Sequence, residues 1–185
     1  MTEQRIAEEK AAGIIKTFAE KMGTMGYAGI VSVSIGGKIT WGEEPFETLY
    51  SDADDTLYFV KENGKNSYHF WSEKKEEKNI ALKIIDTDAD LAGIHRMILE
   101  EKGETGGAFH VAYEDFKKLY DFAMRSVVRN GRKVQTLLFT LEAAEMQNEV
   151  ALDEIMEILK QTIISSLRSV DTGTRYSCSQ YILLL

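Results

Sequence analysis

The chain has 185 residues, a formal net charge of −8 and a sequence pI near 5.0, with 44% hydrophobic and 28% charged residues. This length is enough for one sizeable core or two small ones, and the acidic balance disfavours a general nucleic-acid binder, which carries a basic face. A single cysteine, Cys178, excludes an intrachain disulfide and fits a reducing cytoplasmic compartment, while apolar runs of about five residues are far short of the roughly 20 that span a membrane.

The first part of the chain alternates between helical and strand patterns. Apolar residues at helical spacing indicate the helices, and the β-branched stretch GIVSVSIGG indicates a buried strand. Gly42 and Pro45 mark a loop, Gly64 is typical of a helix end, and Tyr58 is expected on the apolar side of the second helix. The expected elements are a helix over residues 4–22, a strand over 29–37, a helix within the stretch 45–66 that ends at Gly64, and a short strand over 67–71.

The second part begins with the charge run SEKKEEKN, and helical spacing returns from Ile80 to Ile98 until a group of glycines breaks it. An apolar face that runs from Phe116 to Val127 then predicts another helix. The remaining expected elements are a buried strand over residues 134–141, a helix over 149–171 and a terminal hairpin with its first strand at 175–176 and its last apolar run ending at 185. This alternation of helices and strands predicts an α/β or α+β fold.

The stretch ADDTLYFVKENGKNSYHF resembles the C-terminal signature of GGDEF domains, the diguanylate cyclase family. That signature has an Ala-Asp pair, a Leu-Tyr pair, a lysine and then Gly-basic-Asn before a last strand, and VSVSIGG resembles the Ser-Ile-Gly strand that precedes it. The resemblance covers residues 1–71, about the second half of such a domain. The matching residues are Ala53, Asp54, Leu57, Tyr58, Lys61, Gly64, Lys65 and Asn66.

Residues 107–185 resemble the first half of the same domain. The strand LLFTL is similar to the family's first strand, and Arg168-x-x-Asp171 is followed after five residues by SCSQY, where the family has its Gly-Gly-Asp-Glu-Phe hairpin. The resemblance therefore implies two half-domains joined by a charged linker or helix at residues 72–106, or one permuted whole with a mixed sheet flanked by helices. A half-domain alone would expose a sheet edge and an apolar face, so the halves are expected to pair, within one chain or between two copies.

The resemblance also implies what the hairpin lacks. A family cyclase binds GTP and two divalent metal ions through carboxylates on the hairpin and the first strand, and such ions require hard oxygen ligands. Here Ser177 and Cys178 replace the glycines, Ser179 and Gln180 replace the acidic pair, and Thr140 replaces the aspartate of the first strand. We therefore expect no catalysis, metal or cofactor in this chain, with Mg²⁺ and GTP belonging to a complete family site elsewhere.

Two residue pairs are nucleotide-binding candidates. In the family, Arg168 and Asp171 would correspond to an inhibitory site for cyclic di-GMP; the alternative is an arginine that suits a helix end and an aspartate that accepts local backbone N–H groups. Lys61 and Lys65 match positions that reach nucleotide phosphates in the family, and their separation places them on one helix face or at its end. The alternative for them is two solvated lysines near a helix C-terminus.

Two further patterns do not predict metal sites. The acidic stretch DTDAD begins like a calcium-binding loop, but Leu91 and Met97 stand where that loop needs glycine and glutamate, so Asp90 is better interpreted as a helix N-cap. The three histidines are scattered through the chain. They are His69, His95 and His110.

Three functions remain open from the sequence. The first is a catalytically silent cyclic di-GMP signalling module that acts as a regulatory or interaction domain. The second is a cyclic di-GMP receptor that uses Arg168 and Asp171. The third is a fragment of an active diguanylate cyclase whose catalytic motif lies upstream.

Overall fold

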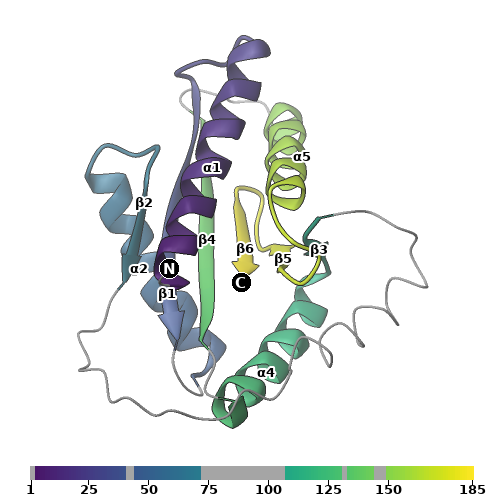
Figure 1. The fold of residues 1–185 in the computed structure, drawn as a ribbon. Helices are drawn as coiled ribbons and strands as arrows, with labels where there is room; N and C mark the ends of the chain where they lie inside the picture. Colours follow the sequence, from purple (N-terminus) through teal and green to yellow (C-terminus); the bar gives the residue numbers. More distant parts are fainter. Residues whose placement is uncertain (1–2, 41–43, 72–106, 131–132, 144–148) are drawn as a thin grey trace.

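The computed structural model describes residues 3–40, 44–71, 107–130, 133–143 and 149–185 (Figure 1). The charged segment 72–106, with its predicted helix and the DTDAD stretch, lies outside the described residues. The described elements are α1 (Glu3–Thr24), β1 (Val31–Thr40), α2 (Phe46–Glu62), β2 (Tyr68–Trp71), β3 (Phe109–His110), α4 (Tyr113–Asn130), β4 (Val134–Ala143), α5 (Glu149–Ser165), β5 (Thr172–Arg175) and β6 (Gln180–Leu184).

All the described strands belong to one mixed sheet in the order β2-β1-β4-β6-β5-β3. β1 runs antiparallel to β4 along its whole length, from Val31 opposite Ala143 to Thr40 opposite Val134. β2 is parallel to β1, and the β5–β6 hairpin continues the sheet on the other side of β4. Strands from residues 1–71 and 107–185 therefore complete a single sheet within one chain, and the predicted mixed α/β class is confirmed.

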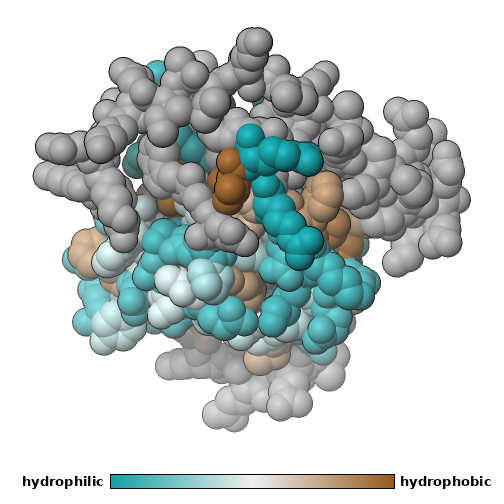
Figure 2. Space-filling view, turned by 90° about the horizontal axis from the view of Figure 1, so that it is seen from below, coloured by the Kyte–Doolittle hydropathy of each residue, from teal (hydrophilic) through white to brown (hydrophobic). Residues whose placement is uncertain are grey.

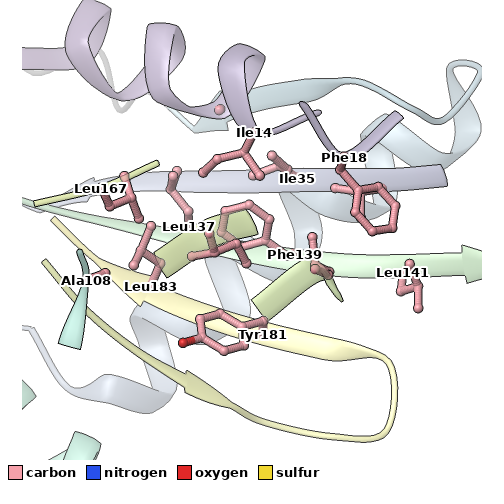
Figure 3. Packing of buried hydrophobic residues seen from close by; sticks show 14 of the residues in the cluster. Ile14, Phe18, Ile35, Ala108, Leu137, Phe139, Leu141, Leu167, Tyr181 and Leu183 are labelled. Carbon is pink, nitrogen blue, oxygen red and sulfur yellow. The ribbon is translucent and has the colours of Figure 1, made fainter. Parts of the chain in front are cut away.

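Helices cover both faces of the sheet (Figure 1). Figure 3 shows the core under α1, where Ile14 and Phe18 lie above Ile35 of β1 and Phe139 of β4. A second core lies between the opposite face and the helices α2 and α4, which contribute residues such as Leu57 and Phe116. We call the first face the α1/α5 face and the second the α2/α4 face.

Alternation along β1 decides where its polar residues lie. Val33 and Ile35 belong to the core under α1 and α5, so Ser34 and Lys38 point to the α2/α4 face. Gly36 lies on that same face, where a Cβ atom would be 2.2 Å from the carbonyl oxygen of Ala53. The glycine therefore lets the backbone of α2 lie directly on the sheet, beside the polar residues of β1.

One helix ends close to its predicted stop, and another ends earlier than predicted. α2 ends at Glu62, two residues before Gly64, and Gly64, Lys65 and Asn66 all have positive φ angles, between 47° and 107°. α5 ends at Ser165, where the hydroxyl groups of serine side chains bond back to the carbonyl oxygen of Thr162. The chain then turns into β5.

Two other details differ from the sequence-based expectation. Tyr58 is 64% exposed, because Thr56 and Leu57 occupy the buried positions of that turn of α2. The first strand of the terminal hairpin is Thr172–Arg175 rather than residues 175–176, because Tyr176 already belongs to the turn and bonds to the backbone of Gln180.

The face of the molecule seen from below is mostly polar where it is described (Figure 2). Figure 2 views the molecule from below and shows hydrophilic side chains around a few separate apolar areas. Among the described helices, none combines the length and apolar character that crossing a membrane requires.

Candidate functional site

The polar hairpin predicted from the sequence joins β5 to β6. The backbone N–H groups of Tyr176 and Ser177 both donate to the carbonyl oxygen of Gln180, at 2.9 and 3.3 Å. The guanidinium of Arg175 donates to the carbonyl oxygens of Ser177 and Cys178, at 3.0 Å each, and also pairs with Asp153 of α5. The arginine therefore fixes the turn from the α1/α5 face.

The structure brings two of the predicted positions together and adds a third residue. Gln180 lies opposite Thr140 in the sheet, and its side-chain amide donates to the Thr140 hydroxyl at 3.4 Å. The Tyr50 hydroxyl of α2 donates to the amide oxygen of Gln180, also at 3.4 Å. Burial, together with the charge of Asp54, raises the pKa of Tyr50 to about 12, so this phenol stays neutral at physiological pH. We call these three residues the neutral network.

Ser179 contributes to the turn through its backbone. Its carbonyl oxygen accepts from the N–H group of Leu141 at 2.8 Å, and its own N–H group donates to the Ser177 hydroxyl at 3.3 Å. These bonds hold the hairpin against the end of β4. Ser179 therefore does not belong to the neutral network, but its backbone bonds hold the neighbouring residue Gln180 in place.

A row of polar side chains continues from the neutral network across the sheet. Ser34 of β1 lies opposite Thr140, so both point to the α2/α4 face. Ser34 is fully buried, and its hydroxyl has no hydrogen-bond partner within the described parts of the chain. The Ser34 hydroxyl, which has no partner in the described residues, therefore lies beside the hydrogen-bonded hydroxyl of Thr140.

Aromatic rings connect the hairpin with the helices of this face. The ring of Tyr176 lies 4.8 Å from that of Tyr50 on α2 and 5.3 Å from that of Tyr113 on α4, between centroids. Phe46 contacts Tyr113 in turn, with 6.1 Å between their ring centroids. The hairpin is therefore packed against both helices, which keeps Gln180 and Thr140 in fixed positions.

The Arg168 and Asp171 pair lies at the turn between α5 and β5. Asp171 is 5% exposed, and its Oδ2 accepts from the backbone N–H of Arg168 at 3.0 Å and from the ammonium of Lys10 on α1 at 2.8 Å. The Arg168 side chain is exposed. Asp171 thus makes the local backbone bond that the structural alternative describes, and the cyclic di-GMP interpretation of this pair stays a prediction.

The two candidate lysines lie at the end of α2. Lys61 is half-buried in its last turn, whereas Lys65 follows the helix, with a φ of 59°. The Lys65 ammonium is 3.7 Å from the Glu142 carboxylate at the end of β4. Lys65 is therefore an ion-pair partner of Glu142, and its binding of nucleotide phosphate stays a prediction.

The described residues contain no group of three or more His, Cys, Asp or Glu side chains that could hold a metal ion. The ring of His69 lies beside that of Phe59, with 4.8 Å between their centroids and an angle of 40° between their planes. Nδ1 of His110 is 2.9 Å from the hydroxyl of Tyr181. His95 lies outside the described residues.

Comparison with protein-family models, curated proteins and solved structures found no match for this chain.

Sequence reasoning missed three residues of this region. Tyr50 looks like an ordinary apolar position of α2, and only the fold brings it to Gln180. Ser34 and Glu142 were detectable in part, because each is a polar residue in a strand that otherwise reads as buried. The pairing register, which decides their neighbours, is not contained in either strand alone.

Proposed function

We propose that this chain is a catalytically silent, GGDEF-like module of cyclic di-GMP signalling that acts as a regulatory or interaction domain. The neutral network of Tyr50, Gln180 and Thr140 carries this proposal. The resemblance assigns metal-binding carboxylates to the positions of Gln180 and Thr140. Here an amide and two hydroxyl groups bond to one another at that place, and neutral groups of this kind do not hold Mg²⁺ beside a triphosphate.

The strand order supports the GGDEF-like part of the proposal. β4, with the stretch LLFTL, lies between β1, with VSVSIGG, and the β5–β6 hairpin, with SCSQY. The three stretches that resemble different parts of a GGDEF domain are therefore neighbours in one sheet. A permuted whole domain requires these strands to be adjacent, because strands from both halves must form one sheet.

Restoring the carboxylates tests the proposed correspondence. We expect the double variant Thr140→Asp, Gln180→Glu to gain a saturable Mn²⁺ site, seen in NMR spectra as line broadening centred on the amides of residues 140 and 180. The matched control is the double variant Ser166→Asp, Ser169→Asp, which adds the same charge at exposed positions. Broadening that is the same in both variants would contradict the correspondence of Thr140 and Gln180 with metal-binding positions.

Catalytic silence is tested on the unmodified chain. Incubation with GTP and Mg²⁺, followed by chromatography of the nucleotides, is expected to show no cyclic di-GMP. Formation of cyclic di-GMP by the purified chain would overturn the proposal, because the neutral network would then coexist with activity.

Calorimetric titration with cyclic di-GMP separates an interaction module from a receptor. Arg168→Ala is the suitable variant, because the Arg168 side chain is exposed, whereas Asp171 is held by Lys10 and contributes to the fold. We expect no binding heat for either protein. Micromolar binding of cyclic di-GMP that disappears in Arg168→Ala would show that the chain is a receptor and would overturn the proposed interaction module.

A further inference from the structure

A cavity of about 550 Å³ opens at the end of the sheet where β1 begins and β4 finishes. Its walls come from the last turns of α1, the segment 28–32 that leads into β1, the turn 64–66 after α2, and the last two residues of β4. This volume is within the range of small-molecule sites in proteins. The cavity is separate from the neutral network, although both lie beside β4.

The most unusual group in the wall is the Glu142 carboxylate. Its side chain is 15% exposed, and its Oε2 is buried without a hydrogen-bond partner in the described residues. The Lys65 ammonium is 3.7 Å away, which supplies an opposite charge but is too far for a hydrogen bond. A buried carboxylate oxygen without a donor is costly, so this atom would gain from a ligand that brings an N–H group.

The charge of the favoured ligand follows from the different exposure of the two ionic groups. Lys65 is 57% exposed, so its ammonium is hydrated and gains little from an anionic ligand. Glu142 is largely removed from water and gains more from a new partner. The net charge of −8 also attracts cations towards the molecule.

We propose that this cavity binds a small organic cation, an amidinium or protonated amine on a compact apolar body, with Glu142 as its ionic partner. An amidinium presents two N–H groups side by side and can bond to both carboxylate oxygens. Ser32 lies opposite Glu142 in the sheet and lines the same cavity, while Ile30, which is 43% exposed, supplies apolar surface for the body of the ligand. The long side chain of Lys65 turns towards solvent when the ligand enters.

Benzamidine, benzamide and benzoate provide matched probes of similar shape with positive, zero and negative charge. In an NMR titration of the full chain, we expect benzamidine to give saturable shifts at the amides of Ser32, Gly64 and Glu142, and benzamide and benzoate to give weaker ones. Glu142→Gln keeps the shape of the side chain and should weaken benzamidine binding about tenfold or more. Glu154→Gln removes the same charge from an exposed position of α5 and should leave the binding unchanged.

Three results would overturn the proposal. The first is benzamidine binding of equal strength in Glu142→Gln, and the second is the absence of saturable shifts with any probe. The third is stronger binding of benzoate that is lost in Lys65→Ala, which would make the cavity an anion site. None of these results bears on the proposed silent module, whose tests use Thr140, Gln180 and Arg168.

Discussion

The two ends of the α2/α4 face differ in how completely their buried charged groups are paired. Where β1 finishes, the side chain of Lys38 is 6% exposed and its ammonium is paired with both Glu44 and Asp52. Where β4 finishes, the side chain of Glu142 is 15% exposed, and its Oε2 lies 3.7 Å from the ammonium of Lys65. The first end is satisfied by the protein itself, whereas the second leaves an oxygen atom without a donor in the described residues.

At the satisfied end, the cluster around Lys38 connects β1 with the helices α2 and α4; we call it the Lys38 joint. The Thr40 hydroxyl donates to the second carboxylate oxygen of Glu44 at 2.8 Å, and the Tyr120 hydroxyl of α4 donates to its carbonyl oxygen at 2.7 Å. Asp52 extends the joint into α2. The comparison teaches that a buried charge with complete partners holds elements together, whereas one with incomplete partners is the better candidate for ligand binding.

Breaking the satisfied end should have the largest effect. We expect Lys38→Met to lower the free energy of unfolding by about 3 kcal/mol, because two carboxylates lose their shared, buried partner. Urea unfolding followed by circular dichroism measures this change. Lys118→Met removes an exposed lysine paired with Asp115 and should change stability by less than about 0.5 kcal/mol. A similar small change in both variants would show that the Lys38 cluster is not a joint.

The pH dependence of stability gives a second test of the same end. Burial alone lowers the pKa of Lys38, but the hydrogen bond to Asp52 and the charges of Glu44 and Asp52 outweigh it, so the net pKa is raised above 10.5. The folded state therefore keeps this proton more tightly than the unfolded state does. Its stabilising contribution is complete below about pH 10.4 and is lost as the pH rises through the folded pKa.

We therefore expect the loss of unfolding free energy above pH 10.4 to be shallower in Lys38→Met than in the unmodified chain. Urea titrations at closely spaced alkaline pH values measure how the free energy of unfolding changes with pH. Tyr50 and other buried tyrosines also titrate above pH 10.4, so the effect of Lys38 is the difference between the curves of the two proteins. Parallel curves would contradict the raised pKa of Lys38.

At the unsatisfied end, removal of the charge should have the opposite sign. We expect Glu142→Met to raise the free energy of unfolding by about 1 kcal/mol, because a buried oxygen without a hydrogen-bond donor in the described residues is replaced with apolar atoms of similar size. Thermal and urea unfolding measure this gain. Glu154→Met, at an exposed position, should have almost no effect. A clear loss of stability in Glu142→Met would mean that the pair with Lys65 is structural.

The sequence predicted the repeating parts of the fold better than its boundaries. The helix over 4–22 and the strand over 134–141 are close to α1 and β4, because their hydrophobic patterns extend over many residues. Gly64 marks the end of α2 in the sequence, whereas the apolar pattern of 149–171 does not show that α5 ends at Ser165. The short strand β3 has two residues and no pattern of its own.

The candidate site was predictable only in part. The polar hairpin and Thr140 stand out in the sequence because polar residues interrupt apolar strands. Their contact with Tyr50 and the position of Ser34 opposite Thr140 depend on how residues 1–71 pair with residues 107–185. Pairing between segments so far apart in the chain is a property of the whole sheet, so no local pattern indicates it.

The smallest expected effects compare two single hydroxyl groups of β1, one without a partner in the described residues and one that is hydrogen-bonded. Ser34→Ala removes a buried hydroxyl without a hydrogen-bond partner in the described residues, so stability should stay the same or rise by up to about 0.5 kcal/mol. Thr40→Val removes a hydroxyl that donates to Glu44 and should lower stability by about 1 kcal/mol. Both changes are measured by urea unfolding at pH 7. Equal losses in the two variants would mean that the Ser34 hydroxyl has a partner, and the contrast between satisfied and unsatisfied groups would then rest on Lys38 and Glu142 alone.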